Sequence, residues 1–92
     1  MESQTFASVW DAITDTAEQA ENYRLRSECM IAVRAEVEKW GATQAEAAKR
    51  LGLTQPRLND LLRGRIDKFS LDALVNIAAR AGIRVQVMLS AA

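Results

Sequence analysis

Residues 43–65 have the sequence TQAEAAKRLGLTQPRLNDLLRGR, which contains two short helical patterns on either side of Gly52. Thr43 and Glu46 form a capping-box pattern at the start of the first helix, and Thr54 can cap the second. Glycine readily adopts the positive φ that a sharp turn between two helices requires. The short connection therefore predicts a near-perpendicular pair of helices, the helix-turn-helix.

The apolar positions of this stretch support the same arrangement. Ala48 falls at the predicted crossing of the two helices, where a larger side chain would push them apart. The inward-facing positions are Ala47, Ala48, Leu51, Leu53, Leu58, Leu61 and Leu62. Together, the small residue, the turn glycine and this leucine spacing are more specific for a helix-turn-helix than for a general helical hairpin.

A long helix is predicted upstream of this stretch. Thr16 with Gln19 forms another capping-box pattern, and the helix runs to about Trp40, with an early break possible near Asn22. Gly41 is expected to end it. Positions at spacings of three and four place one apolar face at Leu25, Cys29, Ala32, Val33, Val37 and Trp40.

Downstream, the pattern predicts one more helix and then a strand. Ser70 can cap a helix that Gly82 closes, with an apolar face formed by Leu71, Leu74, Val75, Ile77 and Ala78. The period then changes to two, because Ile83, Val85, Val87 and Leu89 alternate with Arg84, Gln86 and Met88. This alternation is typical of a strand over residues 83–89.

The predicted strand has no convincing partner within the chain, and a lone strand leaves its backbone groups unpaired. Two copies pairing antiparallel about a two-fold axis would give a homodimer through Ile83, Val85, Val87 and Leu89. Pairing with Thr5–Val9 of the same chain is the alternative. The expected fold is all-α, a bundle of about five helices with this C-terminal strand. An N-terminal segment (1–15) is expected to precede the helix-turn-helix domain (16–92).

The charge of the chain is divided between its halves, although its net charge is zero. Residues 1–42 contain eight acidic and four basic side chains, and residues 43–92 contain four and eight. A basic half can mark a nucleic-acid-binding face, and scattered solvated charge is the alternative. The basic half is the one that contains the helix-turn-helix pattern.

Several functional classes find no support in the composition. With no histidine and only one cysteine, Cys29, the chain lacks the usual metal-ligand clusters and cannot form an internal disulfide. P-loop and GxGxxG patterns are absent, and no carboxylate pairs convincingly with a nucleophile, so we expect neither enzymatic activity nor a cofactor. No apolar run is long enough to span a membrane, and the acidic N-terminus does not resemble a signal peptide, which favours a cytoplasmic protein.

Polar residues at the start of the second helix have the chemistry that major-groove recognition requires. Gln55 and Asn59 can each pair with adenine N6 and N7, and Arg57 can pair bidentately with guanine O6 and N7. Solvated positions on a surface helix are the alternative for all three. We expect Gln55 and Arg57 to point away from the core.

A second set of residues is expected to contact DNA phosphates. Arg63, Arg65 and Lys68 are grouped directly after the second helix, where they could neutralise phosphates, although Asp67 dilutes their charge. Gln44 opens the first helix and could bond a phosphate together with nearby backbone N–H groups. The other candidate phosphate contact is Thr54, which is expected mainly as a helix cap. For Gln44, Arg63, Arg65 and Lys68, the alternative is that they are simply solvated surface residues.

The stretch TQAEAAKRLGLTQPRLNDLLRGRIDKFSLDAL resembles the Xre-type, lambda-repressor-like DNA-binding domains. Together with FASVWDAI, LRSECMIAV and the strand after RAGIRV, it is similar to short antitoxins of the HigA type, which accompany RelE/HigB-like toxins. The resemblance implies a homodimeric repressor that binds operator DNA, autoregulates its operon and has a RelE/HigB-like toxin as partner. The alternatives are a stand-alone phage-type or metabolic repressor, and a toxin-neutralising module with weak DNA binding. Phe6 and Trp10 are expected to pack on the long helix or to contact a partner protein.

Overall fold

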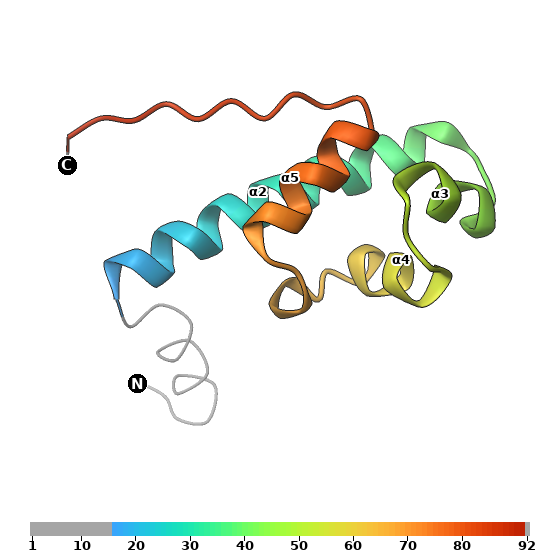
Figure 1. Cartoon of the computed structure of the whole chain (residues 1–92), viewed down its shortest axis with the longest axis horizontal. Coiled ribbons are helices and arrows are strands. Elements are labelled where there is room, and N and C mark those ends of the chain that lie inside the picture. Colours follow the sequence, from blue (N-terminus) through green and yellow to red (C-terminus); the bar gives the residue numbers. More distant parts are fainter. Residues whose placement is uncertain (1–15, 92) are drawn as a thin grey trace.

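The computed structural model describes residues 16–91, which fold into four α-helices and one 3-10 turn (Figure 1). The helices are α2 (Ala17–Trp40), α3 (Gln44–Leu51), α4 (Gln55–Leu62) and α5 (Leu71–Arg80), with the turn η1 (Ile66–Lys68) between α4 and α5. The all-α class is confirmed, but the part of the chain that the structure describes has four α-helices rather than about five. The expectations for Phe6, Trp10 and Thr5–Val9 lie outside the described residues.

Helix α2 begins and ends where its caps predict. The Thr16 hydroxyl accepts a hydrogen bond from the Gln19 backbone N–H at 3.0 Å, and Gly41 ends the helix with φ +61°. The helix runs unbroken past Asn22. Its buried face is formed by Cys29, Met30 and Val33, whereas Ala32, expected inside, is exposed. Val37 and Trp40 pack against the core as predicted, so the expected face differs from the observed one mainly at Ala32 and at Met30, which was not expected inside.

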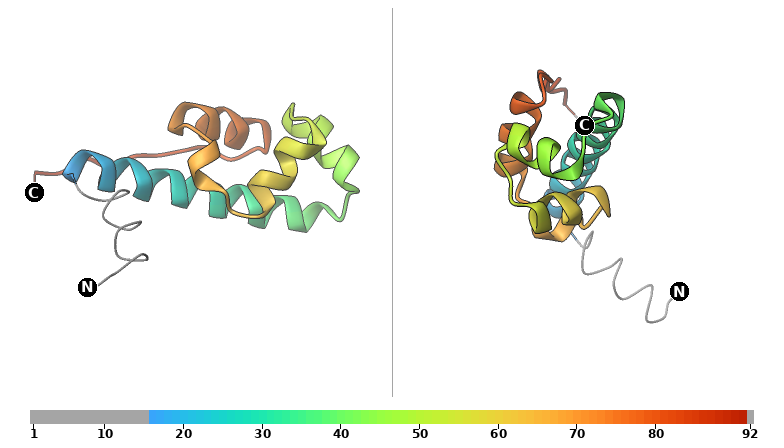
Figure 2. Two further views of the ribbon diagram at one scale, coloured as in Figure 1. Left: turned by 90° about the horizontal axis from the view of Figure 1, so that it is seen from below. Right: turned by 90° about the vertical axis from the view of Figure 1, so that its right-hand side faces the viewer.

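Helices α3 and α4 form the predicted helix-turn-helix at one end of α2, and α5 packs along α2 (Figure 2). The capping box is complete, since Thr43 accepts from the Glu46 N–H and Glu46 accepts from the Thr43 N–H, both at 3.1 Å. Gly52 has φ +72°, and the Leu53 N–H after it donates to the Ala48 carbonyl at 2.8 Å. This bond closes the turn that joins the two helices.

The core lies between α2, the helix-turn-helix and α5. Its buried members are Cys29, Met30, Val33, Ala47, Ala48, Leu51, Leu58, Leu61, Phe69, Leu74, Ile77, Ala78 and Ala81. Phe69 was not among the expected core residues, because the segment after α4 has no helical or strand periodicity. Ser70 caps α5 as predicted, accepting from the Ala73 N–H at 3.1 Å. Val75, expected on the inner face of α5, is exposed instead.

The predicted strand is not present in the part of the chain that the structure describes. Residues 83–91 run outward from α5 as an extended segment with no regular secondary structure (Figure 1). Ile83 and Val85 pack partly against the core, whereas Val87 and Leu89 remain 55% and 88% exposed. A strand exists only as part of a hydrogen-bonded ladder, and alternation in the sequence cannot supply the second strand.

Candidate nucleic-acid interface

Helix α4 presents a polar stripe on the side away from the core. Leu58 and Leu61 are completely buried and fix the rotation of the helix about its axis. Gln55 opens the helix and is exposed, Asn59 lies one turn later and is half-buried, and Arg63 follows at the C-cap and is exposed. A spacing of four residues places these three side chains in one row. The structure therefore brings two predicted base-reading residues and one predicted phosphate contact together.

Arg57 lies on a different side of α4 from this stripe, and its side chain does not point away from the core as expected. Its guanidinium lies 4.1 Å from the centre of the Phe69 ring, and its Nη1 donates to the Lys68 carbonyl at 2.8 Å. The face of an aromatic ring attracts a guanidinium, and a planar guanidinium can stack there while donating in its own plane. Arg57 is half-buried in this position.

The predicted phosphate-binding residues after α4 lie on an exposed basic turn, which we define as residues 63–68. Arg63, Arg65 and Lys68 are all exposed. The Arg65 Nε lies 3.9 Å from the Asp60 carboxylate, a long ion pair between partly exposed groups that contributes little to stability. The turn thus combines three cationic side chains with two nearby carboxylates, those of Asp60 and Asp67.

The remaining predicted contacts lie at the N-termini of α3 and α4. Gln44 is exposed at the first position of α3. The Thr54 hydroxyl accepts from the Arg57 backbone N–H at 3.2 Å, so its helix-capping role is confirmed. Free N–H groups and the helix dipole make such ends favourable for anions.

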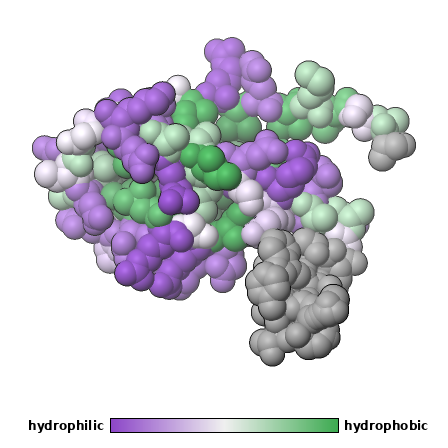
Figure 3. All heavy atoms as spheres, turned by 180° about the vertical axis from the view of Figure 1, so that it is seen from behind, coloured by the Kyte–Doolittle hydropathy of each residue, from purple (hydrophilic) through white to green (hydrophobic). Residues whose placement is uncertain are grey.

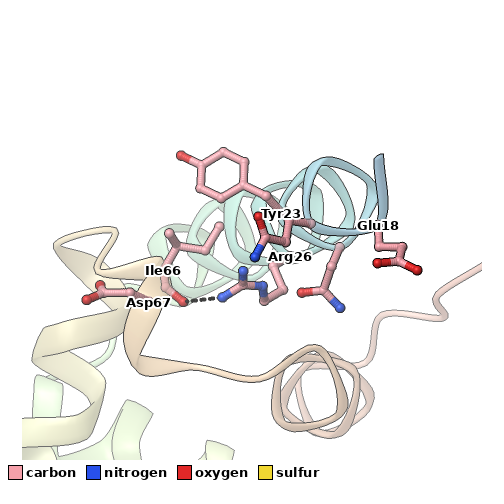
Figure 4. A pocket seen from close by; sticks show the side chains of 7 residues that line it. Glu18, Tyr23, Arg26, Ile66 and Asp67 are labelled. Carbon is pink, nitrogen blue, oxygen red and sulfur yellow. Dashed lines mark hydrogen bonds between the residues drawn. The ribbon is translucent and has the colours of Figure 1, made fainter. Parts of the chain in front are cut away.

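Three other arginines bind parts of the protein itself, and the sequence interpretation missed them. Arg26 of α2 donates from Nη1 to the Ile66 and Phe69 carbonyls at 3.1 and 3.3 Å (Figure 4). Arg80 of α5 donates to the Leu51 carbonyl at 3.2 Å, and Arg50 lies 3.9 Å from the centre of the Trp40 ring. For Arg26 a signal existed, since it precedes Cys29 and Met30 by three and four residues and shares their face.

The described residues also have features that bear on metal binding and on the reactivity of Cys29. They contain no group of three or more potential ligands from His, Cys, Asp and Glu. Burial, and to a smaller degree the charge of Glu28, raises the pKa of the Cys29 thiol, which disfavours the reactive thiolate.

A cavity of about 360 Å³ lies between α2 and η1, lined by Glu18, Gln19, Asn22, Tyr23, Arg26, Ile66 and Asp67 (Figure 4). Among residues 16–91 no helix has the length and apolar character to cross a membrane.

Comparisons with known proteins agree with this architecture. A family model described as a helix-turn-helix domain matches residues 12–90. A solved structure that carries the provisional description of an XRE-family transcriptional regulator superposes with a TM-score of 0.71 at 25% sequence identity. That match covers 79% of this chain and 82% of the other. No curated protein sequence matches the chain.

Proposed function

Because the chain belongs to the helix-turn-helix domain family, we propose that it is a transcription regulator that binds operator DNA through α4. The observation that carries this proposal is the polar stripe of α4, which runs beside the face of the helix that the fully buried Leu58 and Leu61 fix on the core. A helix fixed in this way on a small domain can enter the major groove with its polar side toward the bases. The match to an XRE-family regulator supports the same function.

Recognition would combine base contacts from α4 with phosphate contacts on both sides of it. The amides of Gln55 and Asn59 are suited to adenine N6 and N7, with about 1–3 kcal/mol of discrimination for each good pair. Arg57 would have to release the Lys68 carbonyl before pairing with guanine, so we assign base reading to the two amides. The phosphate contacts would come from Arg63, Arg65 and Lys68 of the basic turn, with Gln44 and Thr54 at the helix N-termini.

We further propose that the chain acts as a homodimer joined through residues 83–89. Val87, Met88 and Leu89 are strongly exposed, and in Figure 3 the C-terminal extension carries hydrophobic residues clear of the helical body. Pairing with the same segment of a second copy would cover these side chains and satisfy the backbone groups. A two-fold dimer would also present two α4 helices to half-sites about 34–36 Å apart.

The more specific role that we propose is that of an autoregulating antitoxin with a RelE/HigB-like toxin as partner. It rests on the sequence resemblance and on the acidic character of residues 1–42, which would attract a basic toxin. A stand-alone repressor is the second candidate, and it agrees with the similar solved structure, which is described as a transcriptional regulator. Both roles place the protein in the cytoplasm with DNA and need no catalytic activity. Co-purification with the product of the adjacent gene, and rescue of growth by co-expression, would favour the antitoxin, and failure of both would favour the repressor.

DNA binding itself can be tested with the region upstream of the gene. Fluorescence anisotropy at fixed salt should show tighter binding of the full chain to this duplex than to a shuffled duplex of equal composition. The preference should amount to at least about a thousandfold under moderate salt, the lower end of the range for specific regulators. Equal affinity for the two duplexes would remove the claim of a specific operator in this region.

A further inference from the structure

The basic turn is held by arginines from two different helices. Arg26 of α2 donates to the carbonyls of Ile66 and Phe69, and Arg57 of α4 donates to the carbonyl of Lys68. Figure 4 shows the Arg26 side chain reaching from α2 to Ile66. Three backbone carbonyls, two in the turn and one at Phe69 directly after it, are thus bound by guanidinium groups from outside the turn.

The two arginines connect the turn to different parts of the domain. Arg26 connects the turn to α2. The buried Nε of Arg26 has no hydrogen-bond partner, so the hydrogen bonds that hold this guanidinium are those from Nη1 to the two carbonyls. Arg57 connects the turn to α4, the helix that carries the polar stripe. Phe69 is only 2% exposed and supplies a fixed ring against which the Arg57 guanidinium stacks.

The first half of the turn is bonded to α4 through the backbone, because the N–H groups of Arg63, Gly64 and Arg65 donate to the carbonyls of Asn59, Leu61 and Asp60, each at 3.0 Å. In the second half, residues 66–68, the Ile66 N–H donates to the Gly64 carbonyl at 2.9 Å and the Lys68 N–H donates to the Arg65 carbonyl at 3.1 Å. These two bonds stay within the turn, so they do not set the distance between its second half and α4. The Arg57 contacts at Lys68 and Phe69 do so directly.

We propose that Arg57 is a positioning residue for DNA binding, which holds the second half of the basic turn, residues 66–68, in register with the polar stripe of α4. This inference rests on the proposed function. With this half fixed, Lys68 can meet a phosphate next to those met by Arg63 and Arg65, while Gln55 and Asn59 reach the bases. Ordering these groups before binding lowers the conformational entropy lost in the complex. Without Arg57 the second half of the turn can move relative to α4, and the phosphate contact of Lys68 weakens for every DNA sequence.

Three roles of Arg57 predict different results. A base-reading arginine confers preference for one base pair, so its loss would reduce discrimination between duplexes. A direct phosphate contact would be lost with Arg57 but kept when Phe69 is changed. A positioning residue would be disabled by either change, because both remove the stacked contact that fixes the turn.

The test compares Arg57→Met, Arg57→Lys and Phe69→Leu in the full chain, by anisotropy with the upstream duplex and the shuffled duplex over a range of salt. Arg57→Met and Phe69→Leu should each weaken binding to both duplexes by about five- to tenfold and flatten the salt slope by about one unit. Arg57→Lys should not restore binding, because an ammonium cannot stack and donate as a guanidinium does. The ratio of the two affinities should stay unchanged.

Arg50→Met is the matched control, since Arg50 is also stacked on an aromatic ring, that of Trp40, away from the basic turn. Its binding should remain close to wild type. Circular dichroism and a melting curve identify variants that fail to fold. If Phe69→Leu does not fold, Phe69→Met and Arg57→Lys replace it in the comparison with Arg57→Met. Loss of discrimination in Arg57→Met, or wild-type binding by a folded variant at Phe69, would overturn the inference while the proposed function stands. If the wild type binds neither duplex at low salt, the proposed function fails and the inference fails with it.

Discussion

At the scale of single residues, Gly52 and Gly41 have the same backbone conformation in different surroundings. Both end a helix with positive φ, +72° at Gly52 and +61° at Gly41. A Cβ at Gly41 would meet nothing within 4 Å, whereas a Cβ at Gly52 would collide with the guanidinium of Arg80. Arg80 is placed there because it donates to the carbonyl of Leu51, one residue before the turn.

The pair gives a controlled prediction on stability. Gly41→Ala should cost about 1–2 kcal/mol in the free energy of unfolding, the strain of a left-handed conformation at a residue with a Cβ. Gly52→Ala should cost roughly 1 kcal/mol more, because it also displaces Arg80 from the Leu51 carbonyl. Urea denaturation of both variants measures the difference. Equal losses would mean that the Arg80 contact contributes nothing to the turn.

Cys29 provides a second residue-scale prediction. The thiol is buried between α2 and the rest of the core, and burial raises its pKa above the ordinary value. Because the thiolate is the reactive form, less of it is present at a given pH in the folded chain than in the unfolded one. Reaction with a disulfide reagent at pH 8 should be more than about tenfold slower in buffer than in urea. Similar rates would show that the core opens around α2.

At the scale of elements, the sequence predicted the features that local chemistry controls. Thr16, Thr43, Thr54 and Ser70 were recognised as caps because a cap acts within its own helix turn, and each accepts the expected N–H. The rotation of α3 and α4 followed from their leucine spacing for the same reason. The stripe of α4 could therefore be predicted at Gln55 and Asn59.

Features that depend on distant partners could not be predicted in this way. The Arg57 side chain stacks on the ring of Phe69 and so does not point away from the core. Phe69 lies in a segment without helical or strand periodicity, so the sequence pattern did not indicate that it is buried. Arg80 reaches the helix-turn-helix from α5, far along the chain. Residues 83–89 have the alternation of a strand, but within the described chain nothing pairs with them.

The C-terminal segment gives an element-scale prediction about assembly. Val87 is 55% exposed, so Val87→Asp should leave the helical content unchanged while placing a charge in the proposed two-fold interface. Light scattering should show a dimer for the wild type and a monomer, or a much weaker dimer, for the variant. The control is Gln86→Asp, because Gln86 belongs to the other set of alternating positions, and this variant should stay dimeric. An unchanged dimer in Val87→Asp would place the interface elsewhere in the chain.

At the scale of the whole molecule, six of the eight basic side chains of residues 43–92 fall into two groups with different uses. Arg50, Arg57 and Arg80 contact a ring or a backbone carbonyl of the protein, and in these positions they serve the fold. Arg63, Arg65 and Lys68 are exposed on the basic turn directly after α4. The net zero charge of the chain thus coexists with a local cationic surface beside the polar stripe, which is the distribution that DNA binding requires.

The central claim is that α4 selects the DNA sequence. Its most direct test is to measure how tightly Gln55→Ala and Asn59→Ala bind the upstream duplex and the shuffled duplex at one salt concentration. Asn76→Ala, which removes an exposed amide of α5, serves as the control. We predict that each α4 variant loses about 1–3 kcal/mol of binding to the upstream duplex and almost none to the shuffled duplex. The control should match the wild type. Undiminished preference for the upstream duplex in both α4 variants would contradict the account.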